Sequence, residues 1–369
     1  MRVEAVELHH LAIPLVRPFE TSFARQTGRD VLLVHVRTDV GDGWGECVAM
    51  AGPFYSSEYV DGAADVMRSY LVPALFGAGQ VTAENAATTF APVVGHRMAK
   101  AAVETALLDA QLRAAGTSFG SYFGATKSAV DCGVSVGISP TIDQLLDEVR
   151  LYVEQGYQRI KLKIKPGWDL EPVAAVRNLL GDDTLLQVDA NTAYSIDDID
   201  HLKQLDQFGL LLIEQPFVEE DIRSHVALSR AISTPVCLDE SIVGTEVAID
   251  AIERGATSVI NVKAGRVGGY LEAVRIHDAC LARQIAVWCG GMLETGIGRA
   301  ANVALAALPG FTLPGDTSAS DRYFAEDLTE PFVLRDGQLD VPTGPGSGVT
   351  VREDLVRDWA TRPVEVLRP

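Results

Sequence analysis

The stretch Leu185-Leu186-Gln187-Val188-Asp189 is a short, mostly apolar run that ends on a carboxylate. β-rich runs that end on a charged side chain recur along the middle of the chain. The charged residues at these ends are Lys163, Asp189, Glu214, Asp239 and Lys263, separated by 26, 25, 25 and 24 residues. Each interval is about one β/α unit long. The pattern therefore predicts that all five side chains lie at the same height, at the carboxyl ends of consecutive parallel strands.

Eight such runs alternate with amphipathic helical stretches between residues 131 and 316. Several runs are apolar throughout, as expected for strands that are covered on both faces. Eight consecutive units favour a closed (β/α) barrel over an open doubly wound sheet. The expected strands are residues 132–138, 159–164, 185–189, 210–215, 236–239, 259–263, 286–289 and 311–313.

The segments on either side of the barrel have a different pattern. Before it, strand-like runs precede helical periodicity, which predicts an α+β lobe. After it, proline and glycine become frequent, and we expect a tail that wraps back to complete that lobe. The expected division is residues 1–127, 128–316 and 317–369. Within the lobe, the expected elements are strands at 3–13 and 31–38, a hairpin turn at 39–43, and helices around 59–76 and 96–115.

The composition excludes several classes of partner. Lys and Arg total 31 against 50 Asp and Glu, a formal charge of −19, which argues against nucleic acid and against an anionic membrane surface. No run of about 18 apolar residues is present, so no membrane span is expected. The N-terminus lacks the apolar core of a signal peptide. The five cysteines form no CxxC pair, which is typical of reduced thiols in a cytoplasmic protein.

Three of the strand-end residues are carboxylates on neighbouring strands, Asp189, Glu214 and Asp239. They would repel one another unless a cation lay between them. Oxygen ligands with no histidine at any strand end favour Mg²⁺, or less exclusively Mn²⁺, over zinc. A single strand-end Asp often caps the following helix instead, but three acids in register argue against that explanation. Asn191 and Glu240 are ambiguous, since each is either a group that supports the ligands or a polar residue entering a loop.

The lysines are concentrated in the same place. The chain has only seven, and four of them, Lys161, Lys163, Lys165 and Lys263, fall at the ends of the second and sixth strands. Lys161 and Lys163 are separated by one residue, so both point to the same face of a strand. The second and sixth strands of an eight-stranded barrel are diametrically opposed. Lys163 and Lys263 are therefore predicted to face each other, one removing the α-proton of a carboxylate substrate and the other returning it to the opposite face, beside a metal that stabilises the enediolate.

These residues resemble the enolase superfamily, in particular its muconate-lactonising subgroup and the N-acylamino acid racemase / o-succinylbenzoate synthase family. The resemblance runs along nearly the whole chain and implies a (β/α)₇β TIM-like barrel under an α+β capping domain, with specificity loops near residues 19–23 and 50–57. The motifs that carry it are Ile160-Lys161-Leu162-Lys163, Val188-Asp189-Ala190-Asn191, Ile213-Glu214-Gln215-Pro216, Leu238-Asp239-Glu240-Ser241, Asn261-Val262-Lys263, residues 50–57, residues 290–296 and residues 313–318.

The resemblance also implies a role for each matching residue. Asp189, Glu214 and Asp239 are expected to bind Mg²⁺, with Mn²⁺ or another divalent cation as a substitute. Lys163 and Lys263 are the expected acid/base pair, and Lys161 assists the substrate carboxylate. Glu240 is expected to support the metal ligands without binding the metal itself. The residues expected at the substrate are Phe19, Met50, Tyr55, Ser135, Asn191, Gly291, Met292, Leu293 and Tyr323, although an apolar residue such as Met50 or Met292 is more often plain core.

The implied activity is racemisation of an N-acylamino acid, often N-succinylated, together with the dehydration that forms o-succinylbenzoate in menaquinone biosynthesis. Both reactions begin with the same α-proton loss from a small carboxylate. The alternatives are a dipeptide epimerase or a muconate cycloisomerase of the same superfamily. Dipeptide epimerases typically carry Asp-x-Asp at the eighth strand, where this chain has Asp316-Thr317-Ser318. A non-enzymatic binding barrel is disfavoured because no ligand or lysine is missing. Barrels of this kind usually assemble, so we expect a homo-oligomer.

Overall fold

The barrel is built on a seven-stranded parallel sheet in the order β11-β10-β9-β8-β7-β6-β5. The computed structural model describes residues 1–369. Almost every residue of these strands is buried, because helices cover the outer face and side chains fill the interior. The strands are β5 (Gly133–Val136), β6 (Arg159–Lys163), β7 (Leu185–Asp189), β8 (Ile213–Glu214), β9 (Val236–Leu238), β10 (Val259–Val262) and β11 (Ala286–Cys289).

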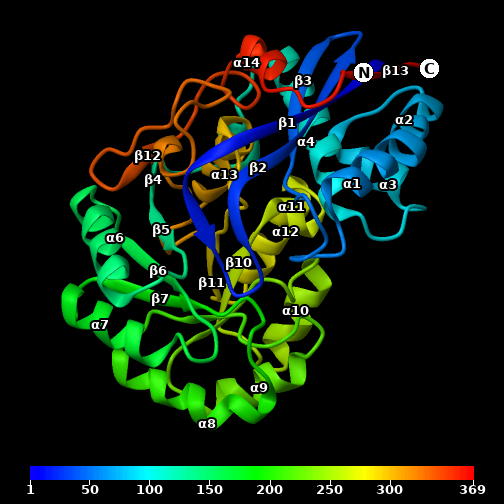
Figure 1. Ribbon diagram of the computed structural model, residues 1–369. Coiled ribbons are helices and arrows are strands. Elements are labelled where there is room, and N and C mark those ends of the chain that lie inside the picture. The colour runs from blue at the N-terminus through cyan, green and yellow to red at the C-terminus, as the bar shows by residue number, and fades with distance from the viewer.

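The helices of the barrel lie between successive strands and surround the sheet (Figure 1). Four of them begin at a side chain that accepts a backbone N–H of the first turn, namely Thr141, Asp169, Asp221 and Thr295, which satisfies donors that the helix cannot pair itself. The helices are α6 (Ile142–Glu154), α7 (Leu170–Leu180), α8 (Ile199–Leu202) between short 3₁₀ turns, α9 (Ile222–Ala231), α10 (Thr245–Glu253), α11 (Ala264–Val267), α12 (Tyr270–Leu281) and α13 (Gly296–Ala306).

The barrel closes without a regular eighth strand, so the prediction of a strand at residues 311–313 is wrong. Phe311 bridges Val287 of β11, and Gly315 bridges Cys132 just before β5. The carbonyl of Gly315 also accepts the N–H of Gly133 at 2.7 Å. Pro314 lies between these contacts and has no N–H to donate to a ladder. The segment therefore joins β11 to β5 through isolated bridges.

The capping domain is an antiparallel sheet in the order β13-β1-β2-β3, with the long helix α4 packed on one face. Gly43 and Gly45 of β3 allow this packing, because a Cβ at either position would lie about 2 Å from the carbonyl oxygens of Ala106 and Ala102 in α4. Figure 1 shows the β1–β2 hairpin reaching from this sheet towards the barrel strands. The elements are β1 (Val3–Glu20), β2 (Arg25–Thr38), β3 (Gly41–Cys47), α1 (Val60–Val66), a π-helical turn (Met67–Leu71), α2 (Val72–Ala78), α3 (Ala83–Phe90), α4 (Arg97–Ala115) and α5 (Phe119–Phe123).

The C-terminal segment contacts both parts of the molecule. Strand β12 (Gln338–Asp340) pairs with β4 (Ala129–Asp131), which leads into the barrel. Beyond α14 (Glu353–Asp358), strand β13 (Glu365–Leu367) pairs with β1 of the capping sheet, so the two termini lie close together (Figure 1). The domain boundaries at residues 127 and 316 stay a proposal.

The cysteines and the helices can be compared with what the composition predicted. All five cysteines are free and buried. None of the helices combines the length and the apolar character that crossing a bilayer requires.

Candidate active site

Three carboxylates lie side by side at the carboxyl edge of the parallel sheet. Asp189 ends β7, Glu214 ends β8, and Asp239 follows β9. The register places Asp189 opposite Glu214, and Lys163 opposite Asp189. All three carboxylate residues are at most 1% exposed. The barrel therefore holds three acids in a space that water does not reach.

Three lysines balance these acids. Lys163 Nζ lies 2.5 Å from Asp189 Oδ2, and Lys263 Nζ lies 2.6 Å from Asp239 Oδ2. Lys161 Nζ lies 3.2 Å from Glu214 Oε2. A buried charge without a partner is costly, so the sheet pairs each carboxylate with an ammonium group.

Lys161 has a further partner, Asp316, in the segment that closes the barrel. Asp316 Oδ2 lies 2.6 Å from Lys161 Nζ, and its Oδ1 accepts a hydrogen bond from Arg159 Nη1 at 2.9 Å. Lys161 also lies 4.6 Å from the centre of the Trp288 ring, close enough for a cation–π contact. These contacts hold Lys161 in one position.

Each of the two opposed lysines is also held by an uncharged group. Lys163 donates to Asn191 Oδ1 at 2.8 Å, and Asn191 Nδ2 donates to Glu240 Oε1 at 3.0 Å. Lys263 donates to the hydroxyl of Tyr55 at 3.0 Å. Asn191 thus links a lysine to Glu240, whereas Tyr55 reaches Lys263 from the capping domain.

The backbone is strained where the strands end. Of seven non-glycine residues with positive φ in the chain, four lie at this edge of the barrel: Asn191, Thr192, Gln215 and Leu293. Such conformations cost free energy and concentrate at functional sites. In Gln215, φ is +37°, and its side-chain oxygen accepts the N–H of Asp239 at 2.9 Å. The strained turn after β8 thereby positions the acid of the next strand.

The pKa values reflect this crowding of charges. Burial, together with the charges of Asp189 and Asp239, raises the pKa of Glu214 well above its usual value. Burial also raises the pKa of Asp189, but the charges of Lys163 and Lys161 outweigh it and lower that pKa to about 2. For Lys263, burial lowers the pKa and the charge of Asp239 more than reverses the effect, so the pKa lies well above its usual value.

The donor set fits a hard divalent cation. Asp239 Oδ1 is buried and has no hydrogen-bond partner, so one carboxylate oxygen of the set is free to coordinate. Three carboxylates on adjacent strands with no sulfur or imidazole suit Mg²⁺ or Mn²⁺. The oxygens of the three acids do not all lie within 4.8 Å of one another, and each acid is paired with a lysine instead. A cation would have to replace some of these lysine contacts.

A small cavity of about 40 Å³ lies above the lysines. Nine of its lining residues are those expected at the substrate: Phe19, Met50, Tyr55, Ser135, Asn191, Gly291, Met292, Leu293 and Tyr323. Lys161, Lys163 and Lys263 line it as well. The structure therefore brings the expected substrate residues of the capping domain and of the barrel to one place, beside both opposed lysines.

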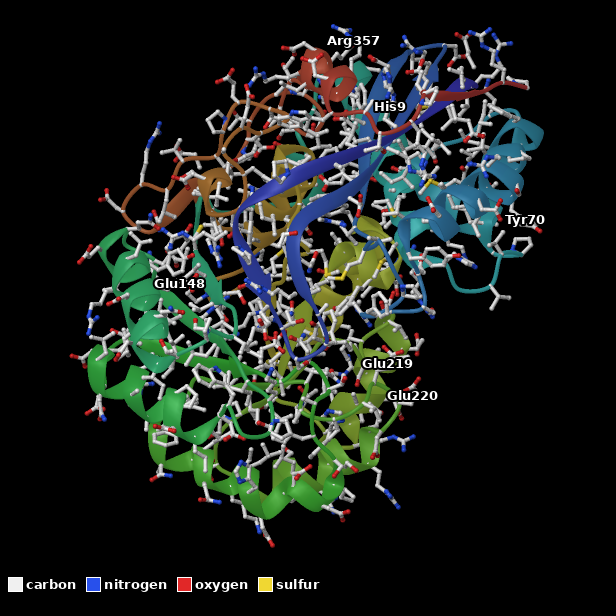
Figure 2. The ribbon with its side chains drawn as sticks, viewed as in Figure 1. His9, Tyr70, Glu148, Glu219, Glu220 and Arg357 are labelled. Atoms are coloured by element: carbon white, nitrogen blue, oxygen red, sulfur yellow. The ribbon has the colours of Figure 1, made fainter.

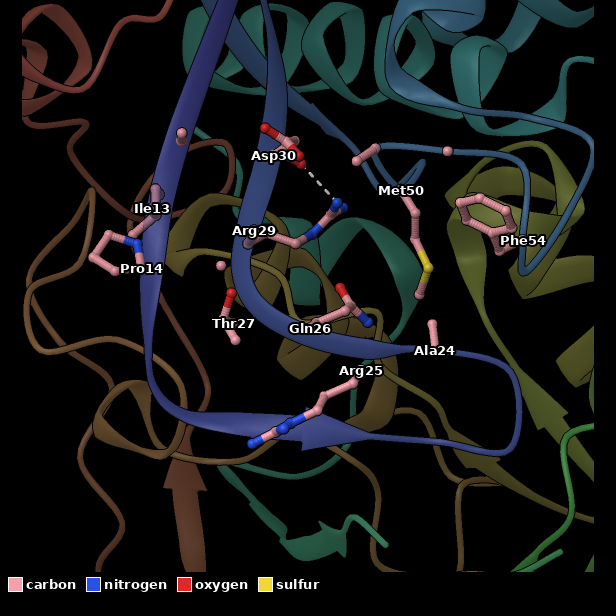
Figure 3. Close-up of a pocket in the computed structure, with 14 residues that line it drawn as sticks. Ile13, Pro14, Ala24, Arg25, Gln26, Thr27, Arg29, Asp30, Met50 and Phe54 are labelled. Atoms are coloured by element: carbon pink, nitrogen blue, oxygen red, sulfur yellow. Dashed lines mark hydrogen bonds between the residues drawn. The ribbon is translucent and has the colours of Figure 1, made fainter.

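A much larger pocket of about 640 Å³ lies outside this cavity, along the β1–β2 hairpin. Figure 3 shows Gln26, Met50 and Phe54 among the residues that line this pocket. Gln26 and Met50 line both spaces. None of the buried lysines or acids reaches the larger pocket, whereas Lys161, Lys163 and Lys263 all line the small cavity.

Comparisons with known proteins agree with this architecture. A family described as "Enolase C-terminal domain-like" matches residues 144–355, and "Mandelate racemase / muconate lactonizing enzyme, N-terminal domain" matches residues 4–124. The chain belongs to the enolase superfamily. As its resemblance to that superfamily predicted, the fold is an enolase-like barrel with a capping domain, and the chain is an enzyme of the superfamily.

Relatives within the enolase superfamily cover nearly the whole chain. N-succinylamino acid racemase of Amycolatopsis sp is 59% identical over 99% of both chains. The o-succinylbenzoate synthase of Geobacillus stearothermophilus is 43% identical over 95% of this chain and 94% of that enzyme. The crystal structure of an enolase superfamily member from Listeria innocua superposes with a TM-score of 0.95 at 39% identity, over 100% of this chain and 99% of the other.

Two residues of this enolase superfamily site, Gln26 and Asn261, were not expected from the sequence. Thr21 and Phe23 line the cavity from the loop expected near residues 19–23, whereas Gln26 lies beyond that loop on β2, and nothing in a polar turn marks it in advance. Asn261 donates to Glu214 Oε1 at 2.7 Å. It stands two residues before Lys263 and therefore on the same face of β10, a spacing that could have identified it.

Proposed function

We propose that the enzyme racemises N-acylamino acids, with N-succinylamino acids as the preferred class, and that the same site forms o-succinylbenzoate by dehydration. The observation that carries the proposal is the position of Lys163 and Lys263. They stand at the ends of β6 and β10, four strands apart in the sheet, and both line one cavity. Two amines on opposite sides of one bound substrate can serve its two faces.

In racemisation, one lysine takes the α-proton as a neutral amine, after it has left its carboxylate partner and lost its own proton, and the ammonium of the opposite lysine returns a proton to the other face. The roles exchange when the other enantiomer binds. Lys161 stays charged, since Asp316 and Glu214 more than offset the effect of burial and raise its pKa above the usual value. We propose that it holds the substrate carboxylate by its charge.

In dehydration, the first step is the same loss of an α-proton. We propose that Lys163 takes this proton and then gives it to the departing hydroxyl, so that water leaves from one face. Lys263 then remains an ammonium that stabilises negative charge. Burial of all three lysines excludes bulk water, which strengthens these electrostatic effects.

We assign Asp189, Glu214 and Asp239 as the residues that hold Mg²⁺, with Glu240 behind them. When bound, the cation supplies positive charge that stabilises the negative charge developing on the substrate carboxylate. Mn²⁺ satisfies the same oxygen donors and is expected to substitute.

The alternative activities have less support. A muconate cycloisomerase of Rhodococcus opacus is a relative at 30% identity, well below the racemase and synthase relatives. A dipeptide epimerase needs an acid for the free amino group of its substrate. Asp316 is the one acid of the Asp316-Thr317-Ser318 stretch, and it is already paired with both Lys161 and Arg159.

The test is isotope exchange at the α-carbon in D₂O, followed by NMR for each enantiomer of an N-succinylamino acid. Lys163→Ala is expected to abolish exchange of one enantiomer and Lys263→Ala that of the other, while each variant loses racemisation. Dehydration to o-succinylbenzoate is assayed in parallel. Exchange of both enantiomers by either single variant would contradict the two-base arrangement.

Assembly as a homo-oligomer and a cytoplasmic location stay predictions from the sequence. Light scattering coupled to size-exclusion chromatography measures the first, and fractionation of the source cells the second.

A further inference from the structure

A second group of metal-binding side chains lies on the capping sheet, outside the catalytic cavity. Glu7 and His9 stand two residues apart on β1 and therefore share a face. His35 of β2 lies directly opposite Glu7 in the register. One ligand atom from each of these three residues lies within 4.8 Å of the other two. Figure 2 shows His9 on β1 in the upper part of the capping domain.

The two distances from Glu7 match edges of a tetrahedral metal site. Glu7 Oε2 lies 3.4 Å from His9 Nε2 and 3.3 Å from His35 Nδ1. Zinc bonds of about 2.0–2.1 Å at tetrahedral angles place neighbouring ligand atoms about 3.3–3.4 Å apart. These separations are long for hydrogen bonds.

The polar atoms around this group are arranged to leave ligand positions free. His9 Nε2 is buried and has no hydrogen-bond partner. His35 Nε2 lies 2.7 Å from Asp42 Oδ2, so if that nitrogen carries the proton, Nδ1 presents a lone pair to Glu7. A carboxylate bound to the far nitrogen of a histidine is the usual support of a metal-ligating imidazole. The ring of His35 also stacks on Trp44, 4.0 Å between centres, which fixes its orientation.

We propose that Glu7, His9 and His35 bind a divalent transition-metal ion of the zinc type. Two imidazoles and one carboxylate suit Zn²⁺ and disfavour Mg²⁺, which prefers oxygen ligands. Side chains of Glu7 and His9 retain 15% and 14% exposure, so an ion can enter from solvent and keep water as a fourth ligand. The ion would fasten β1 to β2, the two strands whose hairpin carries Phe19 and Gln26 into the catalytic cavity.

The test is zinc titration of the chelator-treated, full-length protein in excess Mg²⁺, which occupies the carboxylate site of the barrel. Calorimetry is expected to report a single saturable Zn²⁺ per chain, and Zn²⁺ is expected to raise Tm. Co²⁺ in the same experiment is expected to give the strong visible absorption of a tetrahedral site. Neither readout depends on catalysis.

Variants locate the ion. Glu7→Gln, which keeps the size of the side chain, and His9→Gln are each expected to weaken Zn²⁺ binding at least about tenfold, and Asp42→Asn about 10- to 100-fold. His10→Gln is the matched control, because His10 is adjacent on β1 but points to the opposite face. If His9→Gln fails to fold, Glu7→Gln decides. Absence of saturable binding by the unmodified protein, or equal binding by Glu7→Gln, overturns the proposal and leaves a hydrogen-bonded cluster without an ion.

Discussion

Asp316 and Lys161 form a buried ion pair, with 2.6 Å between Oδ2 and Nζ. This pair joins the segment that closes the barrel to a lysine that lines the small cavity. The other oxygen of Asp316 holds Arg159, which is fully buried as well. Barrel closure and the placement of Lys161 therefore depend on the same carboxylate.

Replacing Asp316 with Asn is expected to impair both stability and catalysis. The change leaves two buried cations short of a partner, for which the expected loss is about 3–5 kcal/mol in the free energy of unfolding. Chemical denaturation measures this loss, and steady-state kinetics are expected to show a lower kcat for racemisation. Asp321→Asn, an exposed acid a few residues further on, is the control. Equal stability of the two variants would contradict the structural role of Asp316.

Replacing the group that holds either of the two opposed lysines is expected to slow exchange of one substrate enantiomer more than that of the other. Asn191→Ala removes the amide that accepts from Lys163, and Tyr55→Phe removes the hydroxyl that accepts from Lys263. Misplacement of a base is expected to slow its own proton transfer about 10- to 100-fold. Exchange in D₂O should therefore slow mainly for one enantiomer in Asn191→Ala and for the other in Tyr55→Phe. Each variant is the control for the other, and equal effects on both enantiomers would argue against separate roles.

The sequence predicted the part of the site that depends on strand periodicity. Lys163, Asp189, Glu214, Asp239 and Lys263 recur once per β/α unit, and a parallel barrel brings residues with that period to one edge. The enolase-like fold followed from the same pattern together with the resemblance of its motifs.

Features that depend on tertiary contacts could not be predicted in this way. The closing segment at residues 311–316 looks like a strand by composition, but Pro314 and the geometry of closure leave only isolated bridges. The pairing of Asp316 with Lys161 joins residues 155 positions apart, and no local pattern reports it. The hydrogen bond from Lys263 to Tyr55 likewise depends on how the capping domain sits on the barrel.

Glu104 is expected to make stability depend on pH. Its side chain in α4 accepts the N–H of Leu271 at the start of α12, and burial raises its pKa from 4.5 to about 7. A raised pKa in the folded state means that the contribution of Glu104 is fully present below pH 4.5 and is lost as pH rises through about 7. The shift corresponds to about 3 kcal/mol.

The measurement is the urea midpoint at pH 5 and pH 8. Glu104→Gln cannot ionise, so its stability relative to the unmodified protein is expected to increase between these two values. Glu253→Gln, at an exposed position of α10, should track the unmodified protein. A constant difference between Glu104→Gln and the unmodified protein at both pH values would show that Glu104 titrates normally.

Removal of divalent cations is expected to abolish activity and to lower Tm. Ligand linkage predicts that Mg²⁺ at about 100 times its Kd stabilises the folded chain by about 2.7 kcal/mol. Asp239→Asn should lose this increment, because it removes a charge from the set of acids that receives the cation. Glu7→Gln should retain it, since Glu7 lies in the capping sheet. Loss of the Mg²⁺ increment in Glu7→Gln would show that the two groups of ligands are not independent.

The β1–β2 hairpin is expected to open when substrate enters. The cavity at the lysines measures about 40 Å³, whereas sites for small molecules usually offer about 300–1,000 Å³, so the cap must separate from the barrel. Phe23 of the hairpin contacts Tyr55, whose hydroxyl accepts a hydrogen bond from Lys263 of the barrel, and an aromatic pair contributes about 0.5–1.5 kcal/mol. Phe23→Ala is therefore expected to raise the open population about 2- to 12-fold and to speed hydrogen–deuterium exchange of residues 19–26. Exchange at β12, far from the hairpin, is the internal control, and unchanged exchange at residues 19–26 would mean that substrate enters by another route.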